Sequence, residues 1–135
     1  MLTVFCDGGS RGNPGKSAFG FVVLNNGQII KEGAGAIGHA TNNFAEYTAL
    51  IKALEWLGKN RNGEELEINM DSKLVVSQVS GLFKVKNATI RGLLFKIREL
   101  EGSFVRINYK YIPREQNTDA DKLVNKVLDE LEFRI

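Results

Sequence analysis

Apolar residues recur along the 135-residue chain at two spacings, one typical of strands and one typical of helices. The order of these segments constrains the fold most strongly. Three strand-like segments come first, and helical stripes then alternate with two further strand-like segments. The predicted strands are residues 2–6, 19–24, 28–35, 66–70 and 105–112, and the predicted helices are 41–57, 71–80, 87–100 and the segment from 117 onward. The predicted element order is therefore βββ-α-β-α-α-β-α.

This order restricts how the strands can pair. Asn25-Asn26-Gly27 is typical of a tight hairpin, so the first three strands form an antiparallel meander. Helices separate the later strands, which therefore pair in parallel through right-handed crossovers. We expect an α/β fold in which helices flank a five-stranded mixed sheet of three antiparallel and then two parallel strands. A chain of this length forms one domain, over residues 1–135.

Composition excludes several classes of protein. The chain is 43% hydrophobic and 25% charged, which favours a packed core over disorder. No apolar run approaches the roughly 18 residues of a membrane span, and the first residues lack a signal-peptide pattern. The single cysteine, Cys6, excludes an internal disulfide and the zinc sites built from paired cysteines. We therefore expect an intracellular, cytoplasmic protein with no membrane partner.

A glycine-rich segment follows the first predicted strand. Residues 7–15 contain four glycines and predict a loop. The spacing fits neither G-x-G-x-x-G nor the Walker G-x-x-x-x-G-K-[ST] pattern, and a strand follows where a helix would be required. A dinucleotide or nucleoside-triphosphate site of those types is therefore excluded. Glycines still allow a backbone to approach a bulky polymer closely.

Four carboxylates lie where predicted elements begin or end. Asp7 follows the first strand, Asp71 follows the fourth, and Glu46 and Asp121 lie in the first turns of two helices. If the first and fourth strands are parallel neighbours, their carboxyl ends bring Asp7 and Asp71 side by side, where open α/β sheets bind ligands. Clustered carboxylates repel one another unless a cation joins them, and oxygen-only ligands favour Mg²⁺ or Mn²⁺.

Taken singly, three of these carboxylates have structural alternatives. Asp7 fits an ordinary turn, Asp71 fits a helix N-cap, and Glu46 fits a residue that complements the helix dipole. The last alternative is weakened because Glu46 precedes Leu50 and Leu54 by four and eight residues, which places it on the apolar stripe of its helix.

The fourth carboxylate is also ambiguous from sequence. Asn117 or Thr118 caps the last predicted helix. Thr118 and Asp121 fit a capping box, and Asp119 is a rival for any role in the site. The only histidine, His39, has no evident serine or cysteine partner, which argues against triad chemistry.

Four motifs, in this order, resemble those of type 1 ribonuclease H: residues 7–15 (DGGSRGNPG), 41–46 (TNNFAE), 70–72 (MDS) and 117–121 (NTDAD). The resemblance implies a ribonuclease H-like fold and hydrolysis of the RNA strand of RNA/DNA hybrids, with 3′-hydroxyl and 5′-phosphate ends. It implies two Mg²⁺ ions, or Mn²⁺ as the alternative. The residues that match the family's catalytic and metal-binding set are Asp7, Glu46, Asp71 and Asp121.

The resemblance also implies a set of substrate contacts. Four residues match contacts to the RNA strand, one matches a contact in the minor groove, and two match a DNA-phosphate pocket. In that order they are Gly8, Gly9, Ser10 and Asn13, then Asn42, then Thr41 and Asn87. For Thr41 a helix cap is an alternative that is compatible with binding.

One departure from the family pattern concerns the segment before the last helix. Many members carry a histidine there that is associated with product release, whereas residues 112–117 contain none. Arg114 is the nearest substitute, as in an archaeal-like subset, although a phosphate contact or a plain surface charge also fits. Alternative functions are additional cleavage of double-stranded RNA and a catalytically silent nucleic-acid-binding module. We expect a monomer with no obligate protein partner.

Overall fold

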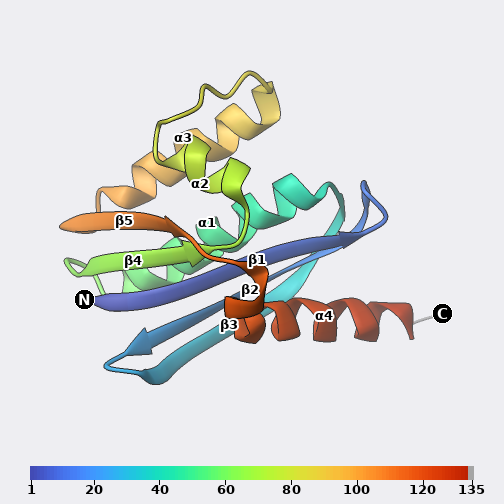
Figure 1. Ribbon diagram of the computed structural model, residues 1–135, viewed down its shortest axis with the longest axis horizontal. Coiled ribbons are helices and arrows are strands. Elements are labelled where there is room, and N and C mark those ends of the chain that lie inside the picture. The colour runs from blue at the N-terminus through green and yellow to red at the C-terminus, as the bar shows by residue number, and fades with distance from the viewer. Residues whose placement is uncertain (134–135) are drawn as a thin grey trace.

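The computed structural model describes residues 1–133 and has the expected element order (Figure 1). The strands are β1 (Leu2–Arg11), β2 (Gly15–Asn25), β3 (Gln28–Ala40), β4 (Glu65–Met70) and β5 (Arg106–Tyr111). The helices are α1 (Asn42–Asn60), α2 (Lys73–Val79), α3 (Ala88–Glu101) and α4 (Thr118–Glu132), with a 3₁₀ turn at Arg114–Gln116. Within residues 1–133 no helix combines the length and apolar character needed to cross a bilayer.

The five strands form one mixed sheet in the order β3-β2-β1-β4-β5. β1 pairs antiparallel with β2 and β2 with β3, whereas β4 pairs in parallel with both β1 and β5. The predicted α/β architecture, with three antiparallel strands followed by two parallel ones, is therefore confirmed. The hairpin between β2 and β3 is also confirmed, because Asn26 and Gly27 both have positive φ, as a type I′ turn requires.

The glycine-rich segment is not the loop that the sequence predicts. β1 continues through Arg11, and its residues pair with β2 from Asp7↔Gly20 to Arg11↔Lys16. Only residues 12–14 form the turn. Regular pairing with β2 outweighs the low strand propensity of glycine here, and it makes Asp7 part of a rigid strand.

The sheet separates two hydrophobic layers of unequal size. The larger layer contains the buried side chains of α1, such as Leu50, Leu54 and Leu57, together with α2 and α3. α4 packs on β1, β2 and β3, where Ala18, Val124 and Leu128 form a small second cluster. In Figure 1, α4 crosses the sheet apart from α1 and α3.

Candidate active site

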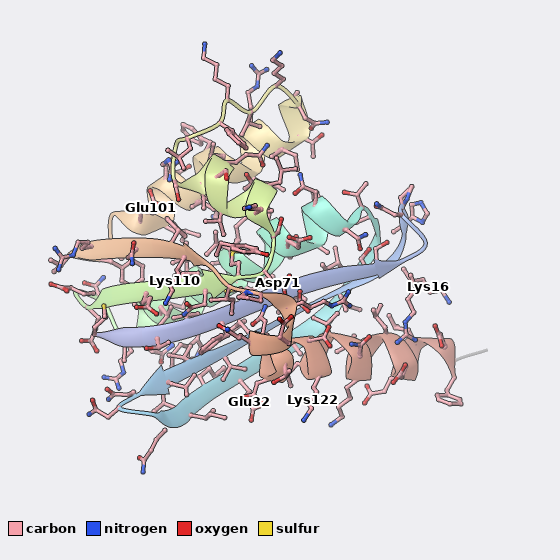
Figure 2. The ribbon with its side chains drawn as sticks, in the orientation of Figure 1. Lys16, Glu32, Asp71, Glu101, Lys110 and Lys122 are labelled. Atoms are coloured by element: carbon pink, nitrogen blue, oxygen red, sulfur yellow. The ribbon has the colours of Figure 1, made fainter. Side chains whose placement is uncertain are left out.

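Adjacent parallel strands bring the first two acidic residues together. Cys6 of β1 pairs with Met70 of β4, so Asp7 and Asp71 follow paired positions on neighbouring strands. Figure 2 shows Asp71 near the middle of the molecule, just beyond the end of β4. The juxtaposition expected from strand order is therefore present in the structure.

Helix α1 brings Glu46 to the two aspartates because β1 packs directly against the backbone of α1, with no side chain between them. Gly8 is buried, and a Cβ atom there would lie 2.2 Å from the carbonyl carbon of Ala45. Glu46 lies in the second turn of α1, since the helix begins at Asn42 after the Thr41 cap, so its predicted place in the first turn is wrong. The prediction that Glu46 lies on the apolar stripe of α1 with Leu50 is confirmed, since Leu50 is completely buried.

The capping alternatives for Asp71 and Asp121 are wrong. Ser72, not Asp71, caps α2, and its hydroxyl accepts a hydrogen bond from Val75 N at 3.2 Å. α4 begins at Thr118 with Asn117 in the N-cap position, and the cap forms no side-chain hydrogen bond. Neither carboxylate is therefore occupied by helix capping.

All four carboxylates line one open cleft of about 320 Å³. They come from β1, α1, the segment after β4, and α4, and the cleft is also lined by Gly8, Gly9, Ser10, Arg11 and Arg114. Asp119, the rival considered for Asp121, is exposed and does not line the cleft.

Burial and mutual repulsion change the acidity of two of these groups. Burial, followed by repulsion from Asp71, Asp121 and Glu46, raises the pKa of Asp7 to about 8. Burial also raises the pKa of Glu46 to about 7, a rise to which Asp71 contributes and which hydrogen bonding to Ser72 partly offsets. Near pH 7 the cleft therefore holds protons that a bound cation would displace.

The donor set fits divalent cations with oxygen ligands. Oε2 of Glu46 is buried and has no hydrogen-bond partner among the described residues. Among residues 1–133, no three Asp, Glu, His or Cys side chains are already arranged so that they could hold a metal ion. The carboxylates must therefore turn toward an ion in order to bind it.

The raised acidities predict an unusual pH dependence of stability in the metal-free protein. The folded chain keeps a proton that the unfolded chain has released on Asp7 between about pH 4 and 8, and on Glu46 between about pH 4.5 and 7. The free energy of unfolding therefore falls as pH rises through these ranges. Thermal unfolding in EDTA across a series of buffers measures the slope, and an Asp7→Asn/Glu46→Gln variant, which lacks both groups, serves as the control. Stability of the wild type that rises from about pH 5 to pH 8 contradicts the assignment.

Three of the residues matched to substrate contacts bind one another. Ser10 N donates to Oδ1 of Asn42 at 2.9 Å, and Asn42 N donates to Oδ1 of Asn13 at 3.0 Å. These bonds join the β1–β2 turn to the start of α1. Gly9 and Ser10 line the acidic cleft, whereas Asn13 and Asn42 lie outside its lining.

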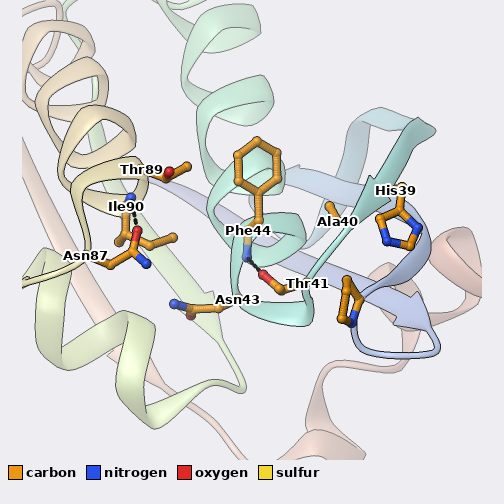
Figure 3. A pocket seen from close by; sticks show the side chains of 9 residues that line it. His39, Ala40, Thr41, Asn43, Phe44, Asn87, Thr89 and Ile90 are labelled. Carbon is orange, nitrogen blue, oxygen red and sulfur yellow. Dashed lines mark hydrogen bonds between the residues drawn. The ribbon is translucent and has the colours of Figure 1, made fainter.

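Thr41 and Asn87 line a second pocket of about 450 Å³. Figure 3 shows them just before the starts of α1 and α3 respectively, with Asn43 between them and His39 at the far side. Thr41 Oγ1 accepts from Phe44 N and Asn87 Oδ1 accepts from Ile90 N, both at 3.1 Å. The helix-cap alternative for Thr41 is therefore confirmed, and Asn87 caps α3 in the same way. Their roles in binding stay predictions.

Arg114 faces the acidic cleft but is held weakly. Its side chain is 81% exposed, and its guanidinium lies 3.9 Å from Oδ1 of Asp121. The structure therefore brings Arg114 to the site without fixing it there.

Sequence reasoning missed a residue beneath the cleft. Asn117 is buried, and its Nδ2 donates to the Cys6 carbonyl at 2.9 Å and to Oδ2 of Asp71 at 3.0 Å. The sequence suggested only a helix cap, because the partners lie 111 and 46 residues away. The one available signal was an asparagine within the motif at residues 117–121.

The chain was compared with known proteins. A family model described as "Reverse transcriptase-like" matches residues 5–127. The bifunctional protein Rv2228c of Mycobacterium tuberculosis is 44% identical over 130 residues, which cover 95% of this chain and 35% of that protein. Ribonuclease HI of Halobacterium salinarum is 40% identical over 127 residues, which cover 93% of this chain and 63% of that protein. The chain thus spans about a third of the first of these relatives and less than two thirds of the second.

Solved structures show the same relationship. The structure of LC11-RNase H1 in complex with an RNA/DNA hybrid superposes with a TM-score of 0.92 at 39% identity, covering 97% of this chain and 99% of that one.

Proposed function

Because this chain belongs to the type 1 ribonuclease H family, we propose that it hydrolyses the RNA strand of RNA/DNA hybrids and leaves 3′-hydroxyl and 5′-phosphate ends. The proposal treats residues 1–135 as one ribonuclease H domain. The observation that carries it is the cleft into which four carboxylates converge from four separate segments of the chain. All four come from a single chain, so we propose that a monomer is sufficient.

We assign the four carboxylates to the binding of two Mg²⁺ ions, with Mn²⁺ as the alternative. Asp7 is central to the set, because Asp71, Asp121 and Glu46 all contribute to its raised pKa. When bound, such ions supply activation of a water molecule and stabilisation of the leaving 3′ oxygen. Asp7 and Glu46 would give up their protons to such ions, and Asp7 on β1 and Asp71 directly after β4 would hold them from neighbouring strands.

We assign substrate contacts to three places: the acidic cleft, the second pocket, and the β1–β2 turn that is hydrogen-bonded to the start of α1. Gly8, Gly9 and Ser10 lie beside the carboxylates and would follow the RNA strand, where the 2′-hydroxyl distinguishes RNA from DNA. Asn13 and Asn42 hold that segment against α1 and face the minor groove in this proposal. Thr41 and Asn87 would bind a DNA phosphate in the second pocket. Arg114, exposed and weakly paired, would take the place of the family's loop histidine in product release.

A cleavage assay tests the proposal. Labelled RNA/DNA hybrid, RNA duplex and DNA duplex are each incubated with Mg²⁺, Mn²⁺ or EDTA, beside Asp71→Asn as the matched variant. We expect cutting of the hybrid's RNA strand with either metal, no cutting in EDTA, and a loss of about 10³-fold in the variant, since metal sites contribute several kcal/mol to such reactions. Cutting of the RNA duplex as well would broaden the substrate class. A folded wild-type protein that binds the hybrid but cuts nothing would instead be a binding module.

A further inference from the structure

We propose that Asn117 is a positioning residue that fixes the relative placement of the carboxylates in the acidic cleft. The inference rests on the proposed function and concerns a residue that touches neither substrate nor cation in this assignment. Its basis is that one buried asparagine, through its side-chain amide and its backbone carbonyl, joins the three segments that carry Asp7, Asp71 and Asp121.

The amide group of Asn117 makes two bonds to different strands. Nδ2 donates one hydrogen to the carbonyl of Cys6, the residue before Asp7, at 2.9 Å. It donates the other to Oδ2 of Asp71 at 3.0 Å. An amide nitrogen has two hydrogens, so both are used. The middle of β1 and the residue that follows β4 are thereby tied to the same atom.

The backbone of Asn117 supplies the third connection. Its carbonyl accepts the first helical hydrogen bond of α4 from Asp121 N, at 3.1 Å. Asn117 thus lies at the junction between the sheet and the helix that presents Asp121. A rotation of α4 about this junction would move Asp121 relative to the other two carboxylates.

The environment of the side chain argues against a packing role alone. Asn117 is only 1% exposed, and its Oδ1 is buried without a hydrogen-bond partner among the described residues. An unsatisfied buried oxygen costs free energy, which an apolar residue of similar size would avoid. What an apolar residue cannot do is donate to Asp71 and to the Cys6 carbonyl, and such bonds to ligating carboxylates orient them for the cation.

The test compares two buried asparagines of the full chain. Asn69 is 2% exposed, and its Nδ2 donates to the Val4 carbonyl at 3.2 Å, so it also bridges to β1 but contacts no carboxylate. Asn117→Ala and Asn69→Ala are compared with the wild type for Mn²⁺ affinity by calorimetry, for kcat and KM on the hybrid, and for Tm. Asn117→Ser is a milder third variant, because one hydroxyl hydrogen cannot make both bonds.

We expect Asn117→Ala to weaken Mn²⁺ binding and to lower kcat, each by about 10- to 100-fold, with a far smaller change in KM. Asn117→Ser lies between it and the wild type, and Asn69→Ala keeps wild-type Mn²⁺ affinity and kcat although its Tm falls. Wild-type Mn²⁺ affinity in folded Asn117→Ala or Asn117→Ser overturns the inference. It is also overturned if all three variants lose Mn²⁺ affinity and kcat in proportion to their fall in Tm. If the wild type itself neither binds Mn²⁺ nor cuts the hybrid, the proposed function fails and the inference fails with it.

Discussion

Asp7→Asn is expected to abolish cleavage of the hybrid while making the metal-free protein more stable. Asp7 is the carboxylate that burial and its three acidic neighbours disfavour most strongly as an anion, with a pKa raised to about 8. Asparagine keeps the shape but removes the charge, so the repulsion disappears together with one of the proposed metal ligands. We expect kcat to fall about 10³-fold or more, corresponding to several kcal/mol of lost transition-state stabilisation.

The gain in stability is expected to depend on pH. Near pH 8 in EDTA the variant should be more stable than the wild type by roughly 2 kcal/mol, and the gain should disappear below about pH 3, where Asp7 is protonated in both the folded and unfolded states. Urea unfolding at several pH values, with and without Mg²⁺, measures the difference. Added Mg²⁺ should stabilise the wild type and leave the variant nearly unchanged. A variant that is less stable than the wild type at every pH would show that Asp7 makes favourable contacts instead.

Gly8→Ala is expected to damage both the fold and the acidic cleft. The new Cβ would lie 2.2 Å from the carbonyl carbon of Ala45 and 2.4 Å from the Glu46 nitrogen, both backbone atoms that cannot rotate away. β1 and α1 must therefore separate. We expect a loss of about 3 kcal/mol, the upper range for overpacking, and a fall in Tm of about 10 °C.

The same substitution should also remove activity from the protein that still folds, because it moves Glu46 away from Asp7. Gly58→Ala, on α1 and outside the lining of the cleft, is the matched control, since its Cβ would meet only the Ser103 side chain, at 3.6 Å. Circular dichroism and single-turnover cleavage at a temperature where both variants are folded separate the two effects. Equal Tm and equal activity for the two alanine variants would refute this account of Gly8.

The strand order and the meeting of Asp7 with Asp71 could be predicted from sequence because both depend on local periodicity. Alternating apolar residues mark strands, and parallel pairing sends their carboxyl ends to one edge. Glu46 could be placed on the inner face of its helix because Leu50 and Leu54 follow at helical spacing. These inferences need only residues that are close to one another in the sequence.

The rest depended on contacts between distant segments. Residues 8–11 look like a loop, and only pairing with β2 makes them a strand. The helix that passes over position 8 leaves no room there for a side chain, and this contact is not visible in the sequence. Asn117 appears to be an ordinary cap until the Cys6 carbonyl and Asp71 are in place. Sequence patterns do not contain these distances.

The unequal hydrophobic layers on the two faces of the sheet determine which carboxylate separates first from the others on heating. Asp7, Glu46 and Asp71 belong to segments tied to the large cluster, whereas Asp121 is carried by α4, whose buried cluster consists of Ala18, Val124 and Leu128. Local opening of a protein follows its least buried unit, at a free energy below that of global unfolding. The four carboxylates should therefore come apart first by partial detachment of α4, so that loss of the proposed activity on heating precedes the collapse of the sheet.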